Sequence, residues 1–451
     1  MKDVLMKQKE LFKSGETYNY KYRLIALTRI KMLLELNEKA ILDALKKDLN
    51  KSEQESYMSE LGLVYDEIRL QKKLVKRYAK KSRVRTPLML SFSKSYVQYQ
   101  PYGSTLIIGP FNYPLQLVLI PMIGAIAAGN TVIVKASEKT PTLSNLLMNI
   151  FNDNFDSEYI YFCKPNLTSF ELNELMGYKY DLIFFTGSYN VGQKVLEKAS
   201  HNLTPTILEL GGKSPVIVDE SAKIEMSAKR IVWGKLMNAG QTCIAPDYIY
   251  VQENIKDKLV AALINEIDKQ YSKEDSVKII DDNAMNRLVS YLDNQEVIHG
   301  GTFDIDRKEF NPTIIDNPSL NSDVMLNEIF GPILPILTFN NVQDVVSRIN
   351  EGQRPLVTYY FGCNKVICDK LNVEISSGAL IQNDTLIHAS NNNLPFGGVG
   401  ASGMFAYHGK YSYYAFSHLK PIVKRSINSE FSMRYMPYSK NKINIIRKLL
   451  K

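Results

Sequence analysis

The cysteine at position 243 stands among small residues in the segment Asn238-Ala-Gly-Gln-Thr-Cys243-Ile-Ala-Pro-Asp247. A single cysteine in such a place is most often a small buried hydrophobic residue. No second cysteine lies near it, so the local sequence indicates neither a disulfide nor a metal pair. The alternative is a reactive thiol, which needs a base and a donor for the negative charge that develops in its reaction.

Two other segments contain the side chains that such a thiol would need. Leu208-Glu209-Leu210-Gly211-Gly212 places a carboxylate between leucines, and Gly109-Pro-Phe-Asn112-Tyr-Pro114 holds an amide in a turn stiffened by prolines. Because apolar residues flank Glu209, we expect burial to raise its pKa and make it a better base. Nucleophile, base and amide donor are the parts of covalent acyl chemistry, so the candidate catalytic residues are Cys243, Glu209 and Asn112.

The composition is typical of a large globular protein. The chain has 451 residues, of which 45% are hydrophobic and 23% are charged, and this length suits two or three domains. The formal net charge of +8 is spread along the chain, and no nucleic-acid-binding motif is present, so we expect no nucleic-acid partner. The four cysteines form no disulfide or metal framework, which predicts no metal site and a reducing, cytoplasmic location.

Residues 95–134 contain no charged side chain, as a membrane span would. Prolines and asparagines nevertheless interrupt this stretch at Asn112, Pro114, Pro121 and Asn130. The uninterrupted pieces are shorter than the roughly 20 apolar residues that a spanning helix needs. We therefore expect a buried strand, a turn, a buried helix and a second buried strand.

Apolar residues at helical spacing predict helices over most of residues 1–80, with a long pattern over 22–50. Farther along, short apolar segments alternate with amphipathic ones, which is typical of parallel sheets covered by helices on both faces. Ligands bind at the carboxyl ends of strands in such sheets. The predicted strands are residues 95–100, 105–108, 131–134, 159–162, 181–185, 206–210, 215–218, 248–251, 313–315, 333–339 and 356–361.

The turn Phe184-Phe-Thr-Gly187-Ser188-Tyr-Asn-Val-Gly192 follows one of these strands and opens a predicted helix. A helix N-terminus in this position can bind phosphate. The two glycines are too far apart for the usual dinucleotide fingerprint, and strand–glycine–helix turns are common in parallel sheets. Capping of the helix by Ser188 is the structural alternative.

Other candidate ligands for a nucleotide lie at a strand end and in a later turn. Lys135 ends a buried strand and Glu138 follows in the same turn, where both side chains can reach the hydroxyls of an adenosine ribose. Glu328, with Phe330 close behind it, is a candidate ligand for a second ribose. A solvated strand end and an ordinary strand-entry turn are the respective alternatives.

Taken together, these segments resemble the aldehyde dehydrogenase family, and the match extends from the first helices to about Lys424. Two segments, Gly240-Gln-Thr-Cys-Ile-Ala-Pro-Asp-Tyr248 and Tyr407-His-Gly-Lys-Tyr411, are similar to the class 3 branch, whose members oxidise medium- and long-chain or aromatic aldehydes. The motifs that carry the resemblance, in the family's order, are Pro-Phe-Asn112-Tyr-Pro, Lys135, Gly187-Ser188 with Gly192, Glu209-Leu-Gly-Gly-Lys, Gly-Gln-Thr-Cys243, Glu328-Ile-Phe-Gly-Pro and Pro-Phe-Gly-Gly-Val-Gly.

The resemblance implies an α/β fold of the aldehyde dehydrogenase type. Such a fold has a Rossmann-type parallel-sheet cofactor domain, an α/β catalytic domain and a small oligomerisation sheet, and the branch typically forms homodimers. The domains that we expect are 1–90 with 104–208 for NAD binding, 209–386 for catalysis, 91–103 with 387–425 as a bridging and oligomerisation segment, and 426–451 as a basic tail.

The resemblance also implies a mechanism. Cys243 attacks a small-molecule aldehyde, Asn112 and the backbone N–H of Cys243 hold the alkoxide, and Glu209 activates the water that hydrolyses the thioester to a carboxylic acid. The implied cofactor is NAD, with NADP as the alternative, because Glu138 should repel a 2′-phosphate. The residues implied in cofactor binding are Lys135, Glu138, Gly187, Ser188, Gly192, Gly211, Glu328 and Phe330.

Some segments depart from the family's usual sequence, and other functions stay open. The departures are Lys135-Ala-Ser-Glu138 where Lys-Pro-Ser-Glu is usual, Cys163-Lys-Pro-Asn166 without glycines, a shorter stretch at 283–310, and Met404-Phe405 where Met-Gly is usual. One alternative function is a cofactor-independent thiol esterase that uses Cys243 and Glu209. Another is a catalytically silent binding protein, which the intact catalytic set disfavours.

The last residues, 439–451, are rich in lysine and arginine, and Ile443, Ile446, Leu449 and Leu450 can share one face of a helix. We favour a terminal helix or loose tail, because the segment is short and has no aromatic anchor. Weak contact with an anionic membrane surface is the alternative.

Overall fold

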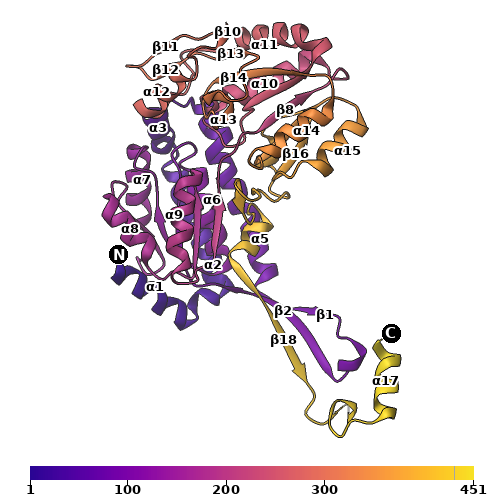
Figure 1. Cartoon of the computed structure of the whole chain (residues 1–451). Helices are drawn as coiled ribbons and strands as arrows, with labels where there is room; N and C mark the ends of the chain where they lie inside the picture. The colour runs from indigo at the N-terminus through magenta and orange to yellow at the C-terminus, as the bar shows by residue number, and fades with distance from the viewer. Residues whose placement is uncertain (431, 451) are drawn as a thin grey trace.

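The computed structural model describes residues 1–430 and 432–450. The chain opens with helices, as the apolar spacing predicted (Figure 1). The pattern over 22–50 is divided at Asn37, whose side chain donates a hydrogen bond of 2.8 Å to the carbonyl oxygen of Leu33 and so ends a helix. The opening elements are α1 (Lys2–Ser14), η1 (Glu16–Tyr18), α2 (Tyr20–Leu36), α3 (Glu38–Leu49), α4 (Glu53–Ser56), the π-helical turn η2 (Tyr57–Leu61) and α5 (Gly62–Tyr78).

The first sheet has the strand order β17-β7-β6-β3-β4-β5, and its strands β3 to β7 run parallel. In β4, Val132 and Val134 join one apolar cluster and Ile133 joins another, so both faces of the sheet are buried, as predicted. Its strands are β3 (Ser104–Ile108), β4 (Thr131–Lys135), β5 (Ile160–Phe162), β6 (Leu182–Thr186), β7 (Thr206–Glu209) and β17 (Gly403–Met404). The helices that follow its strands are α6 (Gln116–Ala128), α7 (Pro141–Asn152), α8 (Ser169–Gly177) and α9 (Tyr189–Ser200).

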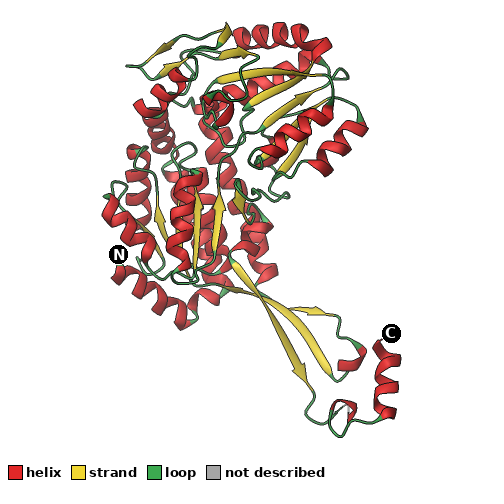
Figure 2. Cartoon of the chain, viewed as in Figure 1, coloured by secondary structure: helices red, strands yellow, loops and turns green. Residues whose placement is uncertain are grey.

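The second sheet has the order β10-β13-β14-β9-β8-β15-β16, with β10 antiparallel to β13 and the remaining pairs parallel. Figure 2 shows helices packed along it. Its strands are β8 (Pro215–Val218), β9 (Tyr248–Gln252), β10 (Glu296–His299), β13 (Thr313–Asp316), β14 (Ile333–Phe339), β15 (Val357–Phe361) and β16 (Ala379–Gln382). The other elements of this part are α10 (Ile224–Leu236), η4 (Met237–Gly240), η5 (Glu253–Ile255), α11 (Lys256–Gln270), α12 (Asp282–Ser290), β11 (Phe303–Asp304), β12 (Glu309–Phe310), α13 (Asp323–Leu326), α14 (Val342–Glu351) and α15 (Lys365–Glu374).

A small antiparallel sheet forms an arm that extends away from the body of the molecule (Figure 1). Strands β2 and β18 pair along their whole length, from Ser93 with Arg425 to Pro101 with Ser417. The elements of this arm and of the segment leading to it are β1 (Ser82–Val84), η3 (Leu88–Leu90), β2 (Ser93–Pro101), η6 (Ile387–Ser390), α16 (Lys410–Ala415), β18 (Ser417–Arg425), η7 (Ser432–Arg434) and α17 (Lys440–Leu450).

The basic tail contains the helix α17, with the side chains of Ile443 and Leu450 exposed. The side chain of Leu449 and all of Lys451, which the sequence placed in this tail, lie outside the described residues. Contact of the tail with a membrane surface stays a prediction. Among residues 1–430 and 432–450, no helix is both long enough and apolar enough to cross a bilayer. The uncharged stretch 95–134 folds instead into β2, β3, α6 and β4, as expected.

The bridging segment 387–425 contributes to more than the arm. Its short strand β17 pairs antiparallel with β7, so that Gly403 lies opposite Glu209 and Met404 opposite Leu208. This pairing brings the late part of the chain against the end of the strand that carries the predicted base. Phe396 and Tyr407, which form an isolated bridge with each other, thereby reach the same region.

Candidate active site

The predicted catalytic residues come from three loops that meet between the two large sheets. Glu209 ends β7, Asn112 follows β3, and Cys243 lies in the loop between η4 and β9. All three line one open cleft of about 500 Å³. The carboxyl ends of parallel strands meet at one edge of a sheet, which explains why β3 and β7 deliver their residues to the same place.

Cys243 belongs to a second cavity as well. This cavity, of about 130 Å³, is lined mainly by apolar side chains, among them Leu117, Trp233, Met237 and Phe396. The thiol therefore lies where a larger, partly polar cleft meets a smaller apolar one. Two different molecules, one in each cavity, could therefore reach the same sulfur.

Cys243 is partly buried, and this burial raises the pKa of its thiol well above the usual value. The carboxyl groups of Glu328 and Glu209 raise the pKa further, whereas the backbone N–H groups of Cys243 and Ile244 act in the opposite direction. Without a bound ligand the thiol is therefore neutral near pH 7. A positive charge close to the sulfur would favour the reactive thiolate.

The loop that carries the thiol begins with an unusual backbone. Asn238, Ala239 and Gly240 all have positive φ angles, of 54°, 51° and 71°. The left-handed conformation costs an alanine about 1–2 kcal/mol, so other contacts must hold this turn. The side-chain amide of Asn238 supplies two of them, with hydrogen bonds of 3.0 Å to the carbonyl oxygen of Asn112 and 2.9 Å to that of Gln241.

Glu209 has the environment that the flanking leucines predicted. It is 3% exposed, and burial raises the pKa of its carboxyl group well above the usual value. Neither carboxyl oxygen has a hydrogen-bond partner among the described residues. A buried carboxyl group that faces a cleft without a partner is suited to receive a proton from a bound molecule.

Asn112 is also buried, and its side-chain amide donates a hydrogen bond of 2.9 Å to the carbonyl oxygen of Gln241. A primary amide has two N–H groups, and within the described chain this bond uses one of them. The other remains available in the cleft that Asn112 shares with Cys243. The sequence prediction of an amide donor near the thiol agrees with this placement.

The residues proposed to bind an adenosine ribose lie at the far side of the same cleft. Nζ of Lys135 donates to the carbonyl oxygen of Ala136 and to Oε2 of Glu138, both at 2.8 Å. Partial burial raises the pKa of Glu138, but the hydrogen bond and charge of Lys135, together with Lys139, outweigh that effect and lower it. Glu138 is thus a carboxylate, and its side chain is 58% exposed to the cleft and solvent.

The turn before α9 places Gly187 and Ser188 in the cleft. A Cβ atom at Gly187 would approach the ring of Phe185 to 2.6 Å, so the turn requires glycine there. Ser188 stands at the N-cap position of α9, but in the described structure its hydroxyl makes no capping bond, contrary to the structural alternative. The free N-terminus of α9 therefore faces the cleft with an unused hydroxyl beside it.

Gly192 is the one predicted cofactor residue that is not among the described residues lining the cleft. It lies in the first turn of α9, where a Cβ atom would come within 2.6 Å of the Leu210 side chain. Its position therefore indicates close packing of the helix against the end of β7. The two glycines of the motif thus have different surroundings.

Glu328 and Gly211 lie in direct contact, since a Cβ atom at Gly211 would approach Oε2 of Glu328 to 2.1 Å. Burial raises the pKa of Glu328 to about 8, and Asp247 contributes to the rise, whereas the Gly212 N–H, Lys213 and Arg287 act against it. Phe330, in a left-handed backbone conformation with φ 44°, packs edge-on against Phe111, with 5.9 Å between ring centroids.

The cleft has the features that a dinucleotide needs. It offers a helix N-terminus for phosphate, the carboxyl groups of Glu138 and Glu328 for ribose hydroxyls, and the orphaned buried hydroxyl of Thr186, which has no partner among residues 1–430 and 432–450. Gly187 and Gly211 keep the cleft open where side chains would fill it. These features fit a nicotinamide dinucleotide, which Lys135, Glu138, Ser188 and Glu328 would hold.

Among the residues that the structure describes, no group of histidine, cysteine and acidic side chains is placed so that it could hold a metal ion. All four cysteines are free thiols. The cytoplasmic location inferred from the cysteines stays a prediction.

Sequence reasoning missed several residues of the site. Tyr407 lines both cavities, and its buried hydroxyl has no partner in the described part of the chain. His408 lines the apolar cavity, where burial, with a contribution from His388, lowers its pKa to about 3. Both belong to the segment Tyr407-His-Gly-Lys-Tyr411, whose sequence indicated a resemblance to the class 3 branch but no role for these side chains. No local sequence pattern indicated that the charged residues Lys51 and Glu60 are buried beside the site.

Comparisons with known proteins agree with this geometry. The sequence model of the aldehyde dehydrogenase family matches residues 2–422. The chain is 41% identical over 450 residues to the 4,4'-diaponeurosporen-aldehyde dehydrogenase of Staphylococcus aureus (strain NCTC 8325 / PS 47), covering 98% of this chain and 97% of that one. It is 37% identical over 442 residues to the "Aldehyde dehydrogenase, dimeric NADP-preferring" of Rattus norvegicus, covering 96% and 97%.

A solved structure is similar along the whole chain. It is described as the substrate-bound state of Staphylococcus aureus AldH, and it superimposes with a TM-score of 0.97 at 40% identity, covering 100% of this chain and 99% of that one. The family uses NAD or NADP to oxidise aldehydes, which agrees with the cleft and the thiol described above. The chain therefore belongs to the aldehyde dehydrogenase family.

Proposed function

We propose that this aldehyde dehydrogenase oxidises apolar aldehydes, with medium or long aliphatic chains or aromatic groups, to carboxylic acids, and that it prefers NAD. The observation that carries the proposal is the position of Cys243, which is shared by an apolar cavity and a cleft suited to a dinucleotide. An apolar aldehyde in the apolar cavity would reach the sulfur while the cofactor occupies the cleft.

The reaction follows from the positions of the chain's own groups. The thiol of Cys243 loses its proton to solvent, and the thiolate adds to the aldehyde carbon. The alkoxide that forms accepts hydrogen bonds from the free N–H of the Asn112 amide and the backbone N–H of Cys243. A bound nicotinamide would supply the hydride acceptor for this chemistry, and loss of hydride from the adduct carbon would leave a thioester on Cys243. Glu209 then takes a proton from water as the water attacks the thioester, and the acid leaves as the thiol is restored.

The apolar cavity supports an extended substrate. Met58, Leu63 and Leu117 line it together with Trp233, and no charged side chain is among the described lining residues. The Staphylococcus aureus relative is named as a dehydrogenase of 4,4'-diaponeurosporen-aldehyde. An apolar aldehyde gains about 0.8 kcal/mol for each CH₂ group that the cavity buries, so longer chains should bind better until the cavity is filled.

The preference for NAD rests on Glu138. Its carboxylate lies in the ribose region of the cleft and is ionised, so it can accept from the 2′-hydroxyl of NAD and repel the 2′-phosphate of NADP. Lys135 is already paired with Glu138 at 2.8 Å, which leaves it less available to a phosphate. The rat relative, which is 37% identical to this chain, is named NADP-preferring, so the opposite cofactor preference occurs among similar proteins.

We further propose that the chain forms a homodimer through its arm. β2 and β18 extend from the body, and the arm exposes apolar side chains: Leu88, Leu90, Phe92, Leu419 and Val423. Exposed apolar side chains on a protruding sheet are typical of an interface between subunits. Light scattering coupled to size exclusion should give about twice the chain mass of 51.4 kDa, and a monomer mass at micromolar concentration would contradict the dimer.

The experiment that tests the proposed function follows reduced nicotinamide with NAD and with NADP, across straight aldehydes of rising length and an aromatic aldehyde. We expect turnover that requires the cofactor, rises with chain length and is lost in Cys243→Ala. Hydrolysis of a thioester without cofactor, with no reduced nicotinamide from any aldehyde, would favour the thiol esterase. Folded protein without either activity would favour a catalytically silent protein.

A further inference from the structure

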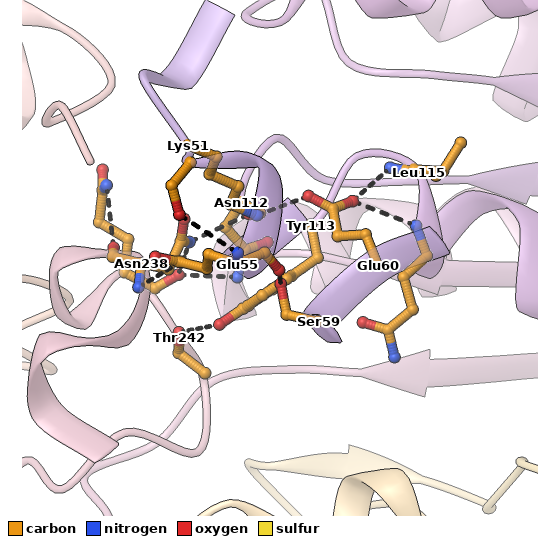
Figure 3. Close-up of polar contacts among 12 residues, drawn as sticks. Lys51, Glu55, Ser59, Glu60, Asn112, Tyr113, Leu115, Asn238 and Thr242 are labelled. Atoms are coloured by element: carbon orange, nitrogen blue, oxygen red, sulfur yellow. Dashed lines mark hydrogen bonds and ion pairs between the residues drawn. The ribbon is translucent and has the colours of Figure 1, made fainter. Parts of the chain in front are cut away.

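A buried ion pair lies directly behind the catalytic amide. Nζ of Lys51 is 2.5 Å from Oε1 of Glu60, and both side chains are fully buried (Figure 3). The same Nζ donates a hydrogen bond of 2.9 Å to the carbonyl oxygen of Asn112 and lies 4.1 Å from the ring centre of Tyr113. The lysine therefore bonds the backbone of the very residue whose side chain serves the reaction.

Glu60 holds the other side of the same turn. Its second oxygen, Oε2, accepts hydrogen bonds from the backbone N–H groups of Leu115, at 2.8 Å, and Gln116, at 3.3 Å. These N–H groups lie at the start of α6, where helical partners are lacking. The pair thus fixes the chain on both sides of Asn112 and Tyr113, whose hydroxyl in turn contacts the Thr242 hydroxyl at 2.7 Å.

Glu55 makes a corresponding backbone contact with the loop that carries Cys243. Its Oε1 accepts a hydrogen bond of 2.9 Å from the backbone N–H of Asn238, the first residue of the left-handed turn. The Asn238 side chain then bonds the carbonyl oxygen of Asn112 at 3.0 Å, the same atom that Lys51 contacts. Figure 3 shows these residues converging between the two loops.

The segment that supplies these charges is short and irregular. Lys51 lies just before α4, Glu55 lies in α4, and Glu60 lies in the π-helical turn η2. Such turns occur often at functional sites. Met58 and Ser59 of the same turn line the apolar cavity, so the segment contacts the substrate cavity while it bonds both catalytic loops.

Stability alone does not account for the buried charges. Desolvation of two charges costs about as much as their attraction returns, and replacing a buried pair with apolar residues is often neutral or stabilising. The hydrogen bonds of Lys51 and Glu60 beyond the pair go to the backbone around Asn112. A pair arranged in this way selects one geometry of that backbone.

Resting on the proposed function, we propose that Lys51, Glu55 and Glu60 are positioning residues for the oxyanion formed at Cys243. Together they fix the Asn112 turn and the Asn238 turn relative to each other, so that the Asn112 amide and the Cys243 N–H point to one site. Loss of this alignment should slow formation of the tetrahedral adduct and also hydrolysis of the thioester, which forms a second oxyanion at the same site, and should leave aldehyde binding nearly unchanged.

The test uses the double variant Lys51→Met/Glu60→Gln of the full chain, which removes both charges at similar volume. Its matched control is Lys31→Met/Glu35→Gln, which removes an exposed ion pair on α2. Stopped-flow measurement gives the rate of the first turnover, and steady-state measurement gives kcat and KM. We expect the first-turnover rate to fall about tenfold or more, KM to change little, and the control to match the native protein.

The same pair of changes is then made in an Asn112→Ala background. If the charges act through Asn112, they should have little further effect there, since the amide that they position is already absent. An equal fall in both backgrounds, or no fall in the native background, would overturn the proposal. Absence of cofactor-dependent turnover in the native protein would instead contradict the proposed function, so the two failures are distinguishable.

A second set of variants covers the case in which the double variant does not fold. Glu55→Gln keeps an oxygen that can accept from the Asn238 N–H, whereas Glu55→Ala removes it. We expect Glu55→Gln to retain a first-turnover rate within about threefold of the native value and Glu55→Ala to lose about tenfold, at equal cofactor binding by fluorescence titration. Equal rates in the two variants would contradict the proposal.

Discussion

The side-chain amide of Asn112 donates a hydrogen bond of 2.9 Å to the carbonyl oxygen of Gln241, two residues before Cys243. This bond joins the loop after β3, in the first sheet, to the loop before β9, in the second. The amide donor and the nucleophile are thus held together although 131 positions separate them (243 − 112). The site depends on how the two sheets are set against each other.

Asn112→Ala should slow the first turnover by roughly 10²–10³-fold, because one preformed donor to an oxyanion contributes about 3–4 kcal/mol. KM for the aldehyde should change little, since the bond forms to the adduct. Rapid-mixing measurement of reduced nicotinamide checks this. A variant with native first-turnover rate would show that the amide does not bind the oxyanion.

Glu138→Gln should raise kcat/KM with NADP by roughly tenfold and lower it modestly with NAD. The change removes the carboxylate that faces the 2′-position and frees Lys135, its partner at 2.8 Å, to bind a phosphate. Steady-state kinetics with both cofactors gives the ratio, and Glu225→Gln, an exposed change on α10, serves as control. An unchanged ratio would place the 2′-position elsewhere.

Glu328 should make the stability of the ligand-free protein depend on pH. Burial, with Asp247, raises its pKa from 4.5 to about 8, so the folded state holds a proton that the unfolded state loses. The stabilisation of the folded state by the proton on Glu328 is fully present below about pH 4.5 and is lost as pH rises through about 8. The thermal midpoint of the native protein should therefore fall more between pH 5 and 8 than that of Glu328→Gln. Parallel curves would contradict this.

The thiol of Cys243 should be slow to alkylate in the ligand-free protein. Because burial and the nearby carboxyl groups raise its pKa, the rate with iodoacetamide should still be increasing at pH 9. Subtracting the Cys243→Ala variant removes the contributions of Cys163, Cys363 and Cys368. A plateau near pH 7 would indicate a thiolate that is stabilised before the cofactor binds.

The central strands of both large sheets could be predicted from the sequence because their signals are local, whereas β10, β16 and β18 were not predicted. Short apolar runs gave β3, β4, β6 and β7, and the residues that end or follow them, such as Lys135 and Glu209, necessarily meet at one edge of the sheet. The raised pKa of Glu209 followed from its neighbours Leu208 and Leu210, and the structure agrees.

Features that depend on distant pairing did not follow from the sequence. Lys51 looked like an ordinary surface lysine, because its partner Glu60 gains meaning only when the Asn112 turn packs between them. Likewise, the pairing of β17 with β7, which brings Tyr407 to the site, joins segments nearly 200 positions apart. Gly192 shared a motif with Gly187, yet it packs against the Leu210 side chain and is not among the described residues that line the cleft.

The central claim, that Cys243 forms a thioester which Glu209 hydrolyses, is tested most directly with Glu209→Gln. Mixed with NAD and a long-chain aldehyde, this variant should show a first turnover close to native, followed by turnover slowed by about 10²–10⁴-fold. Intact-mass and peptide measurements should then find the acyl group on Cys243. Native steady-state turnover in the variant, or an acyl group on a cysteine other than Cys243, would contradict the account.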